Sequence, residues 1–180
     1  MTLGSYWEAN MELIDIIPEF NLYEEFWKIY TKGDIIPPQY ISAEAVVEKS
    51  LIGEGALIYG EVHNSVIGPN VIIEKGCVVR NSIIMRNAVI HEGTQIDKSI
   101  IAEDVIIGKN AVLGCGEEAP NVLKPSVYAF GLVTIGEGSV VPDGVRIGKN
   151  TALRGVTTLE DYPNGELASG GVIKKDGDRA

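Results

Sequence analysis

The sequence predicts an all-β protein, a parallel β-helix of hexapeptide repeats preceded by a short helical segment at the N-terminus. Three observations carry this prediction: the composition, an internal repeat and the residues that punctuate the repeat. The chain has 180 residues, of which 45% are hydrophobic and 7% aromatic. Its apolar residues are mainly Ile and Val, whose branched side chains favour strands.

The internal repeat is the strongest of the three observations. Segments of Ser followed by two aliphatic residues begin at Ser65, Ser82 and Ser99, 17 residues apart. Within these units, large aliphatic residues recur at steps of 6, 6 and 5, at Ile67, Ile73, Val79, Ile84, Ile90, Ile96, Ile101, Ile107 and Leu113. The ladder continues upstream at Ile41, Val47, Ile52 and Ile58 and downstream at Ile135, Val141, Ile147 and Leu153. A period of this kind indicates a solenoid.

Gly and Asn residues punctuate the repeat, as in Gly68, Asn70, Gly76 and Asn87. These residue types tolerate the unusual backbone angles of tight corners. A step of six residues therefore fits one short strand and one corner, and three steps complete one turn. Each turn can bury its apolar row only against its neighbours. We expect the β-helix to span residues 41–160.

Three segments fall outside the ladder. Aromatic residues within 1–40 have partly helical spacing, which predicts helices at 5–14 and 22–29, and Pro37-Pro38 ends this region. We expect these helices to form a linker or to cap one open end of the β-helix. Residues 114–132 interrupt the ladder as an excursion loop, and residues 161–180 form a polar tail.

Charge and composition exclude several classes of partner. The chain has 15 basic and 25 acidic residues, a formal net charge of −10, and its basic residues are scattered. Nucleic acid is therefore not expected as a partner, and no apolar run is long enough to span a membrane. We expect a soluble, cytoplasmic protein. Cys77 and Cys115 are too few and too far apart for a disulfide framework, so we expect both to be reduced structural residues.

The sequence contains no complete set of catalytic residues, and no catalytic or metal-binding residue is assigned. Its two histidines, His63 and His91, cannot supply the three histidine ligands of a zinc-dependent β-helix carbonic anhydrase. His91 directly follows a ladder residue and is an exposed turn residue or, alternatively, the general base of a hexapeptide acyltransferase. Neither a glycine-rich phosphate loop nor a Gly-x-Ser-x-Gly motif is present.

Several segments together resemble one enzyme family. They are Thr2 to Met11 (TLGSYWEANM), Asn21-Leu22-Tyr23, Pro37 to Ile41 (PPQYI), Ser82 to Met85 (SIIM), Lys124-Pro125-x-x-Tyr128, Gly131 to Ile135 (GLVTI) and Val141 to Gly144 (VPDG). The chain is similar over nearly its whole length to the C-terminal region of bacterial glucose-1-phosphate adenylyltransferases, the ADP-glucose pyrophosphorylases.

This resemblance implies a left-handed β-helix that supports tetramer assembly, as a homo- or heterotetramer, and helps to form an allosteric site. It implies that the chain's partner is its own N-terminal nucleotidyltransferase domain. That domain would join ATP and glucose 1-phosphate to give ADP-glucose and pyrophosphate for glycogen synthesis, with Mg²⁺ and ATP bound there. The residues of this chain would then hold no cofactor and have no activity alone. A noncatalytic β-helix subunit of a sugar nucleotidyltransferase remains an alternative.

The resemblance also bears on regulation. Where relatives of the family place a lysine or an arginine that binds an anionic effector, this chain has Glu137 and Glu103. A carboxylate repels an anion, so strong control through those two positions is not expected. The basic residues that could bind an anionic effector elsewhere are Arg80, Arg86, Lys124 and Arg154.

Overall fold

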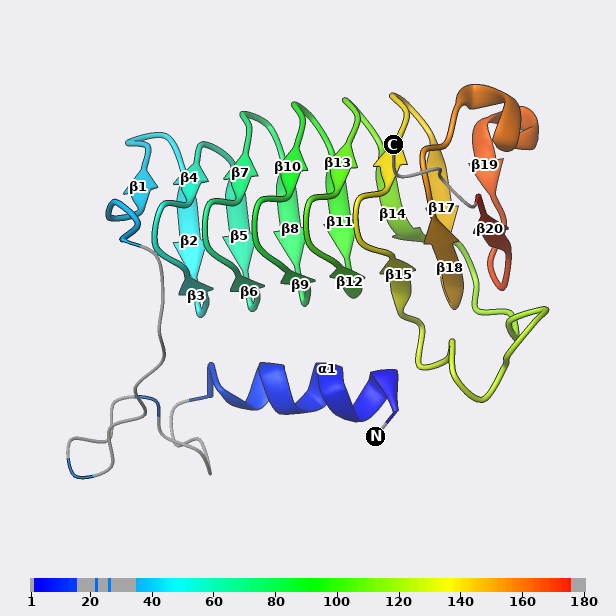
Figure 1. Ribbon diagram of the computed structural model, residues 1–180, viewed down its shortest axis with the longest axis horizontal. Coiled ribbons are helices and arrows are strands. Elements are labelled where there is room, and N and C mark those ends of the chain that lie inside the picture. Colours follow the sequence, from blue (N-terminus) through cyan, green and yellow to red (C-terminus); the bar gives the residue numbers. More distant parts are fainter. Residues whose placement is uncertain (1, 16–21, 23–25, 27–34, 176–180) are drawn as a thin grey trace.

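The computed structural model describes residues 2–15, 22, 26 and 35–175. They form an elongated three-sided solenoid with helix α1 (Leu3–Glu12) lying along one flank (Figure 1). Three parallel sheets run the length of the solenoid. As far as Arg154, successive strands of the chain fall in turn on the first, second and third sheet, and the last coil has strands on the second and third sheets only. The prediction of a parallel β-helix of hexapeptide repeats is therefore confirmed.

The strands are short, from two to four residues each. Sheet 1 contains β1 (Tyr40–Ile41), β4 (Leu57–Ile58), β7 (Ile72–Ile73), β10 (Val89–Ile90), β13 (Ile106–Ile107) and β16 (Val140–Val141). Sheet 2 contains β2 (Val46–Glu48), β5 (Glu61–His63), β8 (Val78–Arg80), β11 (Gln95–Asp97), β14 (Val112–Cys115), β17 (Arg146–Gly148) and β19 (Glu166–Leu167). Sheet 3 contains β3 (Leu51–Ile52), β6 (Val66–Ile67), β9 (Ile83–Ile84), β12 (Ser99–Ile101), β15 (Val133–Ile135), β18 (Thr151–Arg154) and β20 (Val172–Lys174).

The predicted aliphatic ladder fills the core. Ile73, Ile90 and Ile107 stack in register on sheet 1 and are completely buried. A second inward row, which the sequence analysis did not identify, lies two residues before each ladder position and consists of small side chains. On sheet 1 this row is Ala56, Val71, Ala88 and Val105. Alternation of large and small inward residues follows from the period of two along a strand and lets the three walls approach closely.

On sheet 3 the small inward row has serines in successive coils, Ser65, Ser82 and Ser99, which form a serine ladder. The Ser82 hydroxyl donates to the carbonyl oxygen of Arg80 at 2.6 Å and accepts from the backbone N–H of Ser99 at 3.1 Å. Ser65 makes the same contacts one coil earlier. These side chains are fully buried, so each hydroxyl satisfies backbone groups at a corner where the sheet ladder is interrupted.

Helix α1 begins earlier than predicted, at Leu3 instead of residue 5, because Thr2 caps it. The Thr2 hydroxyl accepts from the backbone N–H of Ser5, whose side chain accepts in return from the Thr2 backbone N–H. This reciprocal arrangement is a capping box. The second predicted helix, 22–29, falls largely outside the described residues.

The expectation that the N-terminal helix caps an end of the β-helix is wrong for α1, which packs against a side (Figure 1). Met11 joins a buried cluster with Ile83, Ile100 and Leu132, on the outward face of sheet 3. The Trp7 indole Nε1 donates to the carbonyl oxygen of Asn81 at 2.7 Å. Sheet 3 carries large aliphatic residues on both of its faces there, so its outer face needs a cover, which α1 supplies.

The excursion from the ladder lies between β14 and β15, at residues 116–132. Asn150 holds this loop against the solenoid, because its amide donates to the carbonyl oxygen of Ala119 at 3.0 Å and accepts from the backbone N–H of Gly131 at 2.7 Å. Asn121, also in the loop, donates to the carbonyl oxygen of Asn150 at 2.8 Å. Both asparagine side chains are buried, so the loop is fastened at both of its ends.

The expectation that the β-helix ends at residue 160 and gives way to a polar tail is also wrong. β19 pairs with β17 and β20 pairs with β18, which extends the solenoid to Lys174. The chain reaches this last coil through two 3₁₀ turns, Leu159–Asp161 and Pro163–Gly165, which break the spacing of six. The polar composition is explained by exposure, because only one face of a terminal coil is covered.

Both cysteines are free, as expected. Burial raises the pKa of the Cys77 thiol, which stays protonated at neutral pH and donates to the carbonyl oxygen of His91 at 3.0 Å. Within the described part of the chain, no helix has the length and apolarity needed to cross a membrane.

Candidate functional site

The four basic residues that the sequence analysis selected lie in three different places. Arg80 ends β8 and is exposed, between His63 and Asp97 of the adjacent coils. It lines a shallow cavity of about 190 Å³ that Asp97 also lines. A carboxylate in the same hollow offsets the attraction of Arg80 for an anion.

Arg86 follows β9 and lines a cavity of about 580 Å³ between α1 and the solenoid. Its Nε atom is buried and has no hydrogen-bond partner in the described structure. Glu54 and Glu103 line the same cavity, and Tyr6 and Asn10 of α1 form the opposite wall. Two carboxylates outnumber the single guanidinium, so this larger cavity is electrostatically unsuited to a free anion.

Lys124 and Arg154 are brought together, although they are 30 positions apart in the sequence. Both line a cavity of about 320 Å³ between the excursion loop and the last coils of sheet 3. Lys174, Tyr128 and Thr134 line it too, and none of its described lining residues is acidic. Among the cavities described here, this one alone is lined by two of the four selected residues.

Three further residues of this cavity, Lys174, Thr134 and Tyr128, were not among the candidates from the sequence. Lys174 lies beside Arg154 in register, but this neighbour is visible only once the last coil is recognised. Thr134 stands in the outward row of sheet 3, where the two preceding coils have Ile83 and Ile100. The signal available in the sequence was Thr134 itself, a polar residue at a position where the two preceding coils have isoleucine. Tyr128 was noted only as part of the family resemblance.

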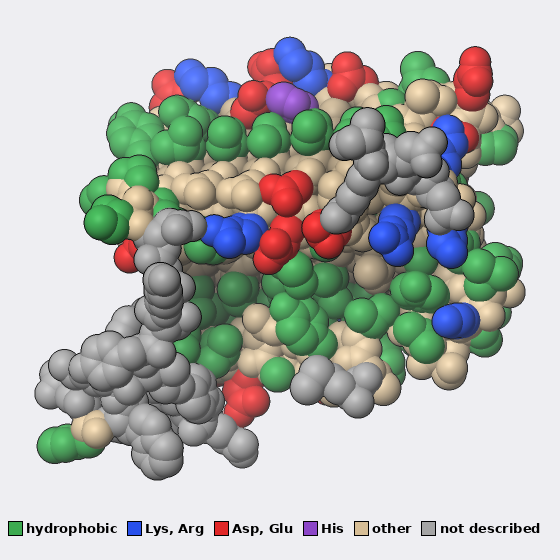
Figure 2. All heavy atoms as spheres, viewed as in Figure 1, with side chains coloured by type: hydrophobic (Ala, Val, Ile, Leu, Met, Phe, Trp, Pro, Cys, Tyr) green, Lys and Arg blue, Asp and Glu red, His purple; other side chains and the backbone are tan. Residues whose placement is uncertain are grey.

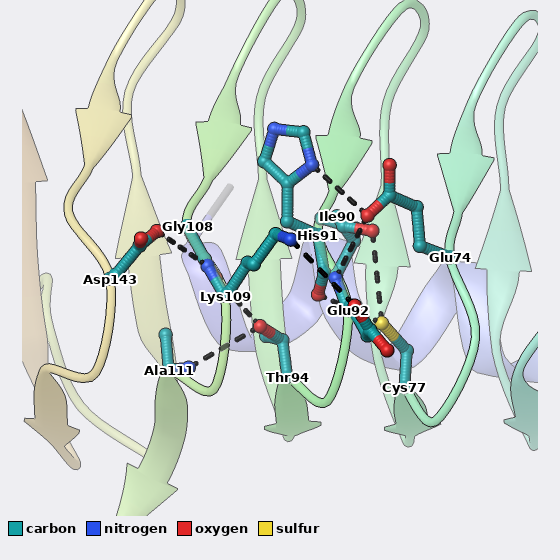
Figure 3. A network of polar contacts seen from close by, with 10 residues as sticks. All are labelled: Glu74, Cys77, Ile90, His91, Glu92, Thr94, Gly108, Lys109, Ala111 and Asp143. Carbon is teal, nitrogen blue, oxygen red and sulfur yellow. Dashed lines mark hydrogen bonds and ion pairs between the residues drawn. The ribbon is translucent and has the colours of Figure 1, made fainter.

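His91 lies on the outside of the solenoid after β10 (Figure 3). Its Nδ1 is 3.1 Å from Glu74 Oε2, on the preceding coil, and the same oxygen accepts from the backbone N–H of Glu92 at 3.0 Å. Burial alone would raise the pKa of the Glu74 carboxyl, but the hydrogen bonds from His91 and Glu92 outweigh it, and the pKa is lowered. The pair therefore joins two coils as an ion pair or hydrogen bond.

His91 does not belong to any of the three cavities described above. Lys109, on the other side of it, reaches Glu92 at 3.7 Å (Figure 3). A general base needs a substrate position within hydrogen-bonding reach. The polar contacts of His91, Glu74, Glu92 and Lys109 link neighbouring coils of the solenoid.

A metal centre is not found either. Within residues 2–15 and 35–175, no group of three or more His, Cys, Asp or Glu side chains is arranged to hold a metal ion. The family resemblance places Mg²⁺ and ATP on a separate nucleotidyltransferase domain, and we derive no chemical step through them.

A three-sided parallel β-helix built in steps of about six residues is typical of hexapeptide-repeat domains. The chain belongs to the GlmU-like C-terminal hexapeptide family, whose profile matches residues 38–133.

Three relatives, each named glucose-1-phosphate adenylyltransferase, show how far the similarity extends. The chain is 69% identical to the protein of Lachnospira eligens over 177 residues, which cover 98% of this chain and 42% of the relative. Identity is 45% over 177 residues to the protein of Acetivibrio thermocellus, with the same coverage. It is 52% over 172 residues to the protein of Thermotoga neapolitana, covering 96% and 41%. The chain thus spans about two fifths of the length of these relatives.

Among solved structures, the acetyltransferase domain of PglB from Neisseria gonorrhoeae aligns with a TM-score of 0.45 and 16% identity, covering 73% of this chain and 55% of that one. This likeness is too distant to carry a functional argument.

Proposed function

We propose that this chain is the β-helix part of a glucose-1-phosphate adenylyltransferase and serves to assemble and regulate that enzyme. The observation that carries the proposal is 69% identity over 98% of the chain to a relative of that name, of which it covers 42%. Adenylyl transfer from ATP to glucose 1-phosphate, with Mg²⁺, would take place on a nucleotidyltransferase domain that is the partner of this chain. A cytoplasmic location is part of the same proposal.

The outward face of sheet 1 supports a role in assembly. Its residues form a straight apolar row of Tyr40, Leu57, Ile72, Val89, Ile106 and Val140. Tyr40 and Ile106 are 53% and 41% exposed. Figure 2 shows this face as a line of hydrophobic side chains along one edge of the molecule. A straight row is complementary to a second copy of itself, so we propose a two-fold contact between copies of this chain as one interface of a tetramer.

A chimera tests the catalytic part of the proposal. In the Lachnospira eligens relative, the matching 42% is replaced by this chain, and pyrophosphate release from glucose 1-phosphate is measured with ATP, UTP, GTP and dTTP. We expect activity that prefers ATP in the chimera and none in this chain alone. The parent enzyme assayed in parallel is the control for the reaction.

Two results would contradict the proposal. One is a chimera that assembles as the parent does but transfers another nucleotide or none. The other is an isolated chain that transfers the nucleotidyl group by itself. A noncatalytic modulating subunit, the alternative, would leave the chimera inactive but change the activity of a separate catalytic partner when added to it.

A further inference from the structure

The excursion loop enters β15 through a tight turn with an unusual backbone. In the turn from Ala129 to Leu132, both central residues have positive φ, 65° at Phe130 and 74° at Gly131. The Leu132 N–H donates to the carbonyl oxygen of Ala129 at 3.3 Å and closes the turn. Positive φ at both central positions defines a type I′ turn, in which glycine, asparagine and aspartate predominate. A phenylalanine at the first of these positions is therefore unexpected.

Phe130 is also exceptional within this chain. The other described non-glycine residues with positive φ are all asparagine, aspartate or lysine. A bulky residue in this region is strained because its Cβ crowds the backbone, and such strain persists only where the surroundings impose it. The side chain is 52% exposed, so burial in the core does not explain the choice of residue. The contacts of its ring indicate what holds the turn.

The Phe130 ring lies against helix α1. Its neighbour there is Gly4, which is buried in the first turn of the helix. A Cβ atom on Gly4 would be 2.6 Å from Cδ2 of Phe130 and 2.7 Å from Cε2, so the ring occupies the space that any larger residue would need. Figure 1 shows the N-terminal end of α1 beside the loop that leads into β15. Glycine is a poor helix former, and the close approach of the ring accounts for it at this position.

Two further contacts join α1 to the same end of the loop. Leu132, the last residue of the loop, is 1% exposed and packs in one cluster with Met11 of α1. The Lys98 ammonium lies over the Trp7 ring of α1, 5.6 Å from its centre. The carbonyl oxygen of Lys98 accepts from the backbone N–H of Val133, which directly follows the loop. The C-terminal end of the loop is therefore built against the helix.

The middle of the loop is more exposed than its ends. Val122, Leu123 and Val127 are 73%, 66% and 39% exposed. A segment with few buried apolar contacts opens locally at a low cost in free energy. The state of the loop should therefore depend on its ends, one of which contacts α1.

We propose that α1 controls the conformation of the excursion loop through Phe130. The contact between the ring and Gly4 stabilises the strained turn, and displacement of α1 lets the turn relax and the loop move away from the solenoid. The loop forms one wall of the cavity of about 320 Å³ through Leu123, Lys124 and Tyr128. The position of α1 thus determines whether this cavity is formed.

This inference concerns the conformation of the chain and goes beyond the proposed function. A failure of the adenylyltransferase assay would leave it standing, and a loop that is independent of α1 would leave that assay unaffected. If both hold, a movement of the nucleotidyltransferase domain that displaces α1 would reach the loop by this route.

Amide hydrogen exchange of the full chain, followed by NMR, tests the proposal. The N–H groups of Gly131 and Leu132 report on the loop, because both are hydrogen-bonded in the closed turn. The N–H of Val89, hydrogen-bonded within sheet 1, reports on the solenoid as a whole.

Two substitutions of Phe130 separate its ring from its backbone. Phe130→Ala removes the ring but keeps a residue that disfavours positive φ, so exchange at the two loop reporters should become about tenfold faster or more. Phe130→Asn removes the same ring but tolerates positive φ, and exchange should change less than about threefold. Exchange at Val89 should be unchanged in both variants.

A substitution on α1 tests the same coupling from the other side. Gly4→Leu places a side chain where the ring lies and should speed up exchange at the loop reporters as Phe130→Ala does. Ala9→Leu, at an exposed position of the same helix, is the matched control and should have no effect. In the Phe130→Asn variant, Gly4→Leu should lose its effect, because neither a displaced ring nor a strained turn remains.

The proposal is overturned if Phe130→Ala and Phe130→Asn give the same exchange at the loop reporters, since the backbone strain would then not matter. Equal effects of Gly4→Leu in the parent chain and in the Phe130→Asn variant would also overturn it. An acceleration at Val89 as large as that at Leu132 in Phe130→Ala would show general destabilisation and would count against it as well.

Discussion

The hydroxyl oxygen of Tyr162 lies 2.8 Å from Thr157 Oγ1, and the pair closes the C-terminal end of the apolar core. The Thr157 hydroxyl donates to the carbonyl oxygen of Val140 at 2.6 Å. The Tyr162 hydroxyl therefore donates to Thr157. Only 2% of Tyr162 is exposed, and burial raises its pKa to about 12.

Tyr162 should make the protein sensitive to alkali. Because its pKa is about 12 in the folded state and its ordinary value is 10.0, the unfolded chain ionises first. Its contribution is complete below pH 10 and is lost as the pH rises toward 12, by about 2–3 kcal/mol in all. Urea unfolding at a series of pH values measures this loss. Tyr162→Phe should lower the free energy of unfolding by about 1 kcal/mol at neutral pH and flatten its decline above pH 10.

The partly exposed Tyr59 provides the control for this experiment, because its hydroxyl makes no hydrogen bond within the described structure. Tyr59→Phe should keep the alkaline decline of the parent chain. If Tyr162→Phe and Tyr59→Phe decline alike, Tyr162 is not the titrating group.

The serine ladder makes a second prediction. Ser82→Ala removes the acceptor for the backbone N–H of Ser99 and leaves that buried group unpaired. It also removes one of two donors to the carbonyl oxygen of Arg80, which keeps its hydrogen bond from the backbone N–H of Lys98. We expect the free energy of unfolding to fall by about 2–3 kcal/mol. Ser126→Ala, an exposed position in the excursion loop, should change it by less than about 0.5 kcal/mol. Thermal unfolding of both variants would reveal equal stabilities if the ladder did not contribute.

The position of α1 predicts what its loss would do. Without residues 1–36 the solenoid should stay folded but aggregate, because Ile83 and Ile100 would be uncovered on the outside of sheet 3. Circular dichroism should retain the strand signal, while light scattering should show large particles.

A second variant separates this cause from general damage. In the shortened chain, Ile83→Thr with Ile100→Thr copies the Thr134 found at the same register and should restore a monodisperse protein. Persistent aggregation of that double variant would indicate that another surface, such as the open edge of the first coil, is responsible.

The apolar row on sheet 1 predicts the site of self-association. Ile106→Lys places a charge in the middle of the row and should weaken association of the chain about a hundredfold without unfolding it. Gln95→Lys, at an exposed strand position of sheet 2, should leave association unchanged. Sedimentation velocity at several concentrations compares the two. Equal association of both variants would place the interface elsewhere.

The repeat was readable from the sequence because each coil uses the same two features, a large inward aliphatic residue and a corner. Ile67, Ile84 and Ile101 occupy identical environments one coil apart, so a single period describes all three. The sequence shows that serine recurs at the same position of successive coils, but it does not show which groups these serines hydrogen-bond. Those depend on the geometry of the corner that precedes each serine.

Other features could not be read from the period. The last coil departs from it, since two 3₁₀ turns separate Leu153 from Ile173, its partner in register. The flank that α1 covers is fixed by packing between distant segments, such as Met11 on Ile100. The same holds for the cavity lined by Lys124, Arg154 and Lys174, which come from a loop and two coils. Sequence chemistry selected two of these three residues, and only the packing of the coils identified the third.

Because α1 is attached to the side of the solenoid, the two ends of the chain should respond differently to a pulling force. A pulling force on the N-terminus is transmitted to the side of the solenoid. It passes through the hydrogen bond from Trp7 to Asn81 and the apolar contacts of α1 with β9 and β12. This force acts in shear on the hydrogen bonds of several strands at the same time. A force on the C-terminal end acts first on β20, whose only neighbour within its sheet is β18 among the described strands, and then separates one coil after another. The protein should therefore resist tension at one end and unwind from the other.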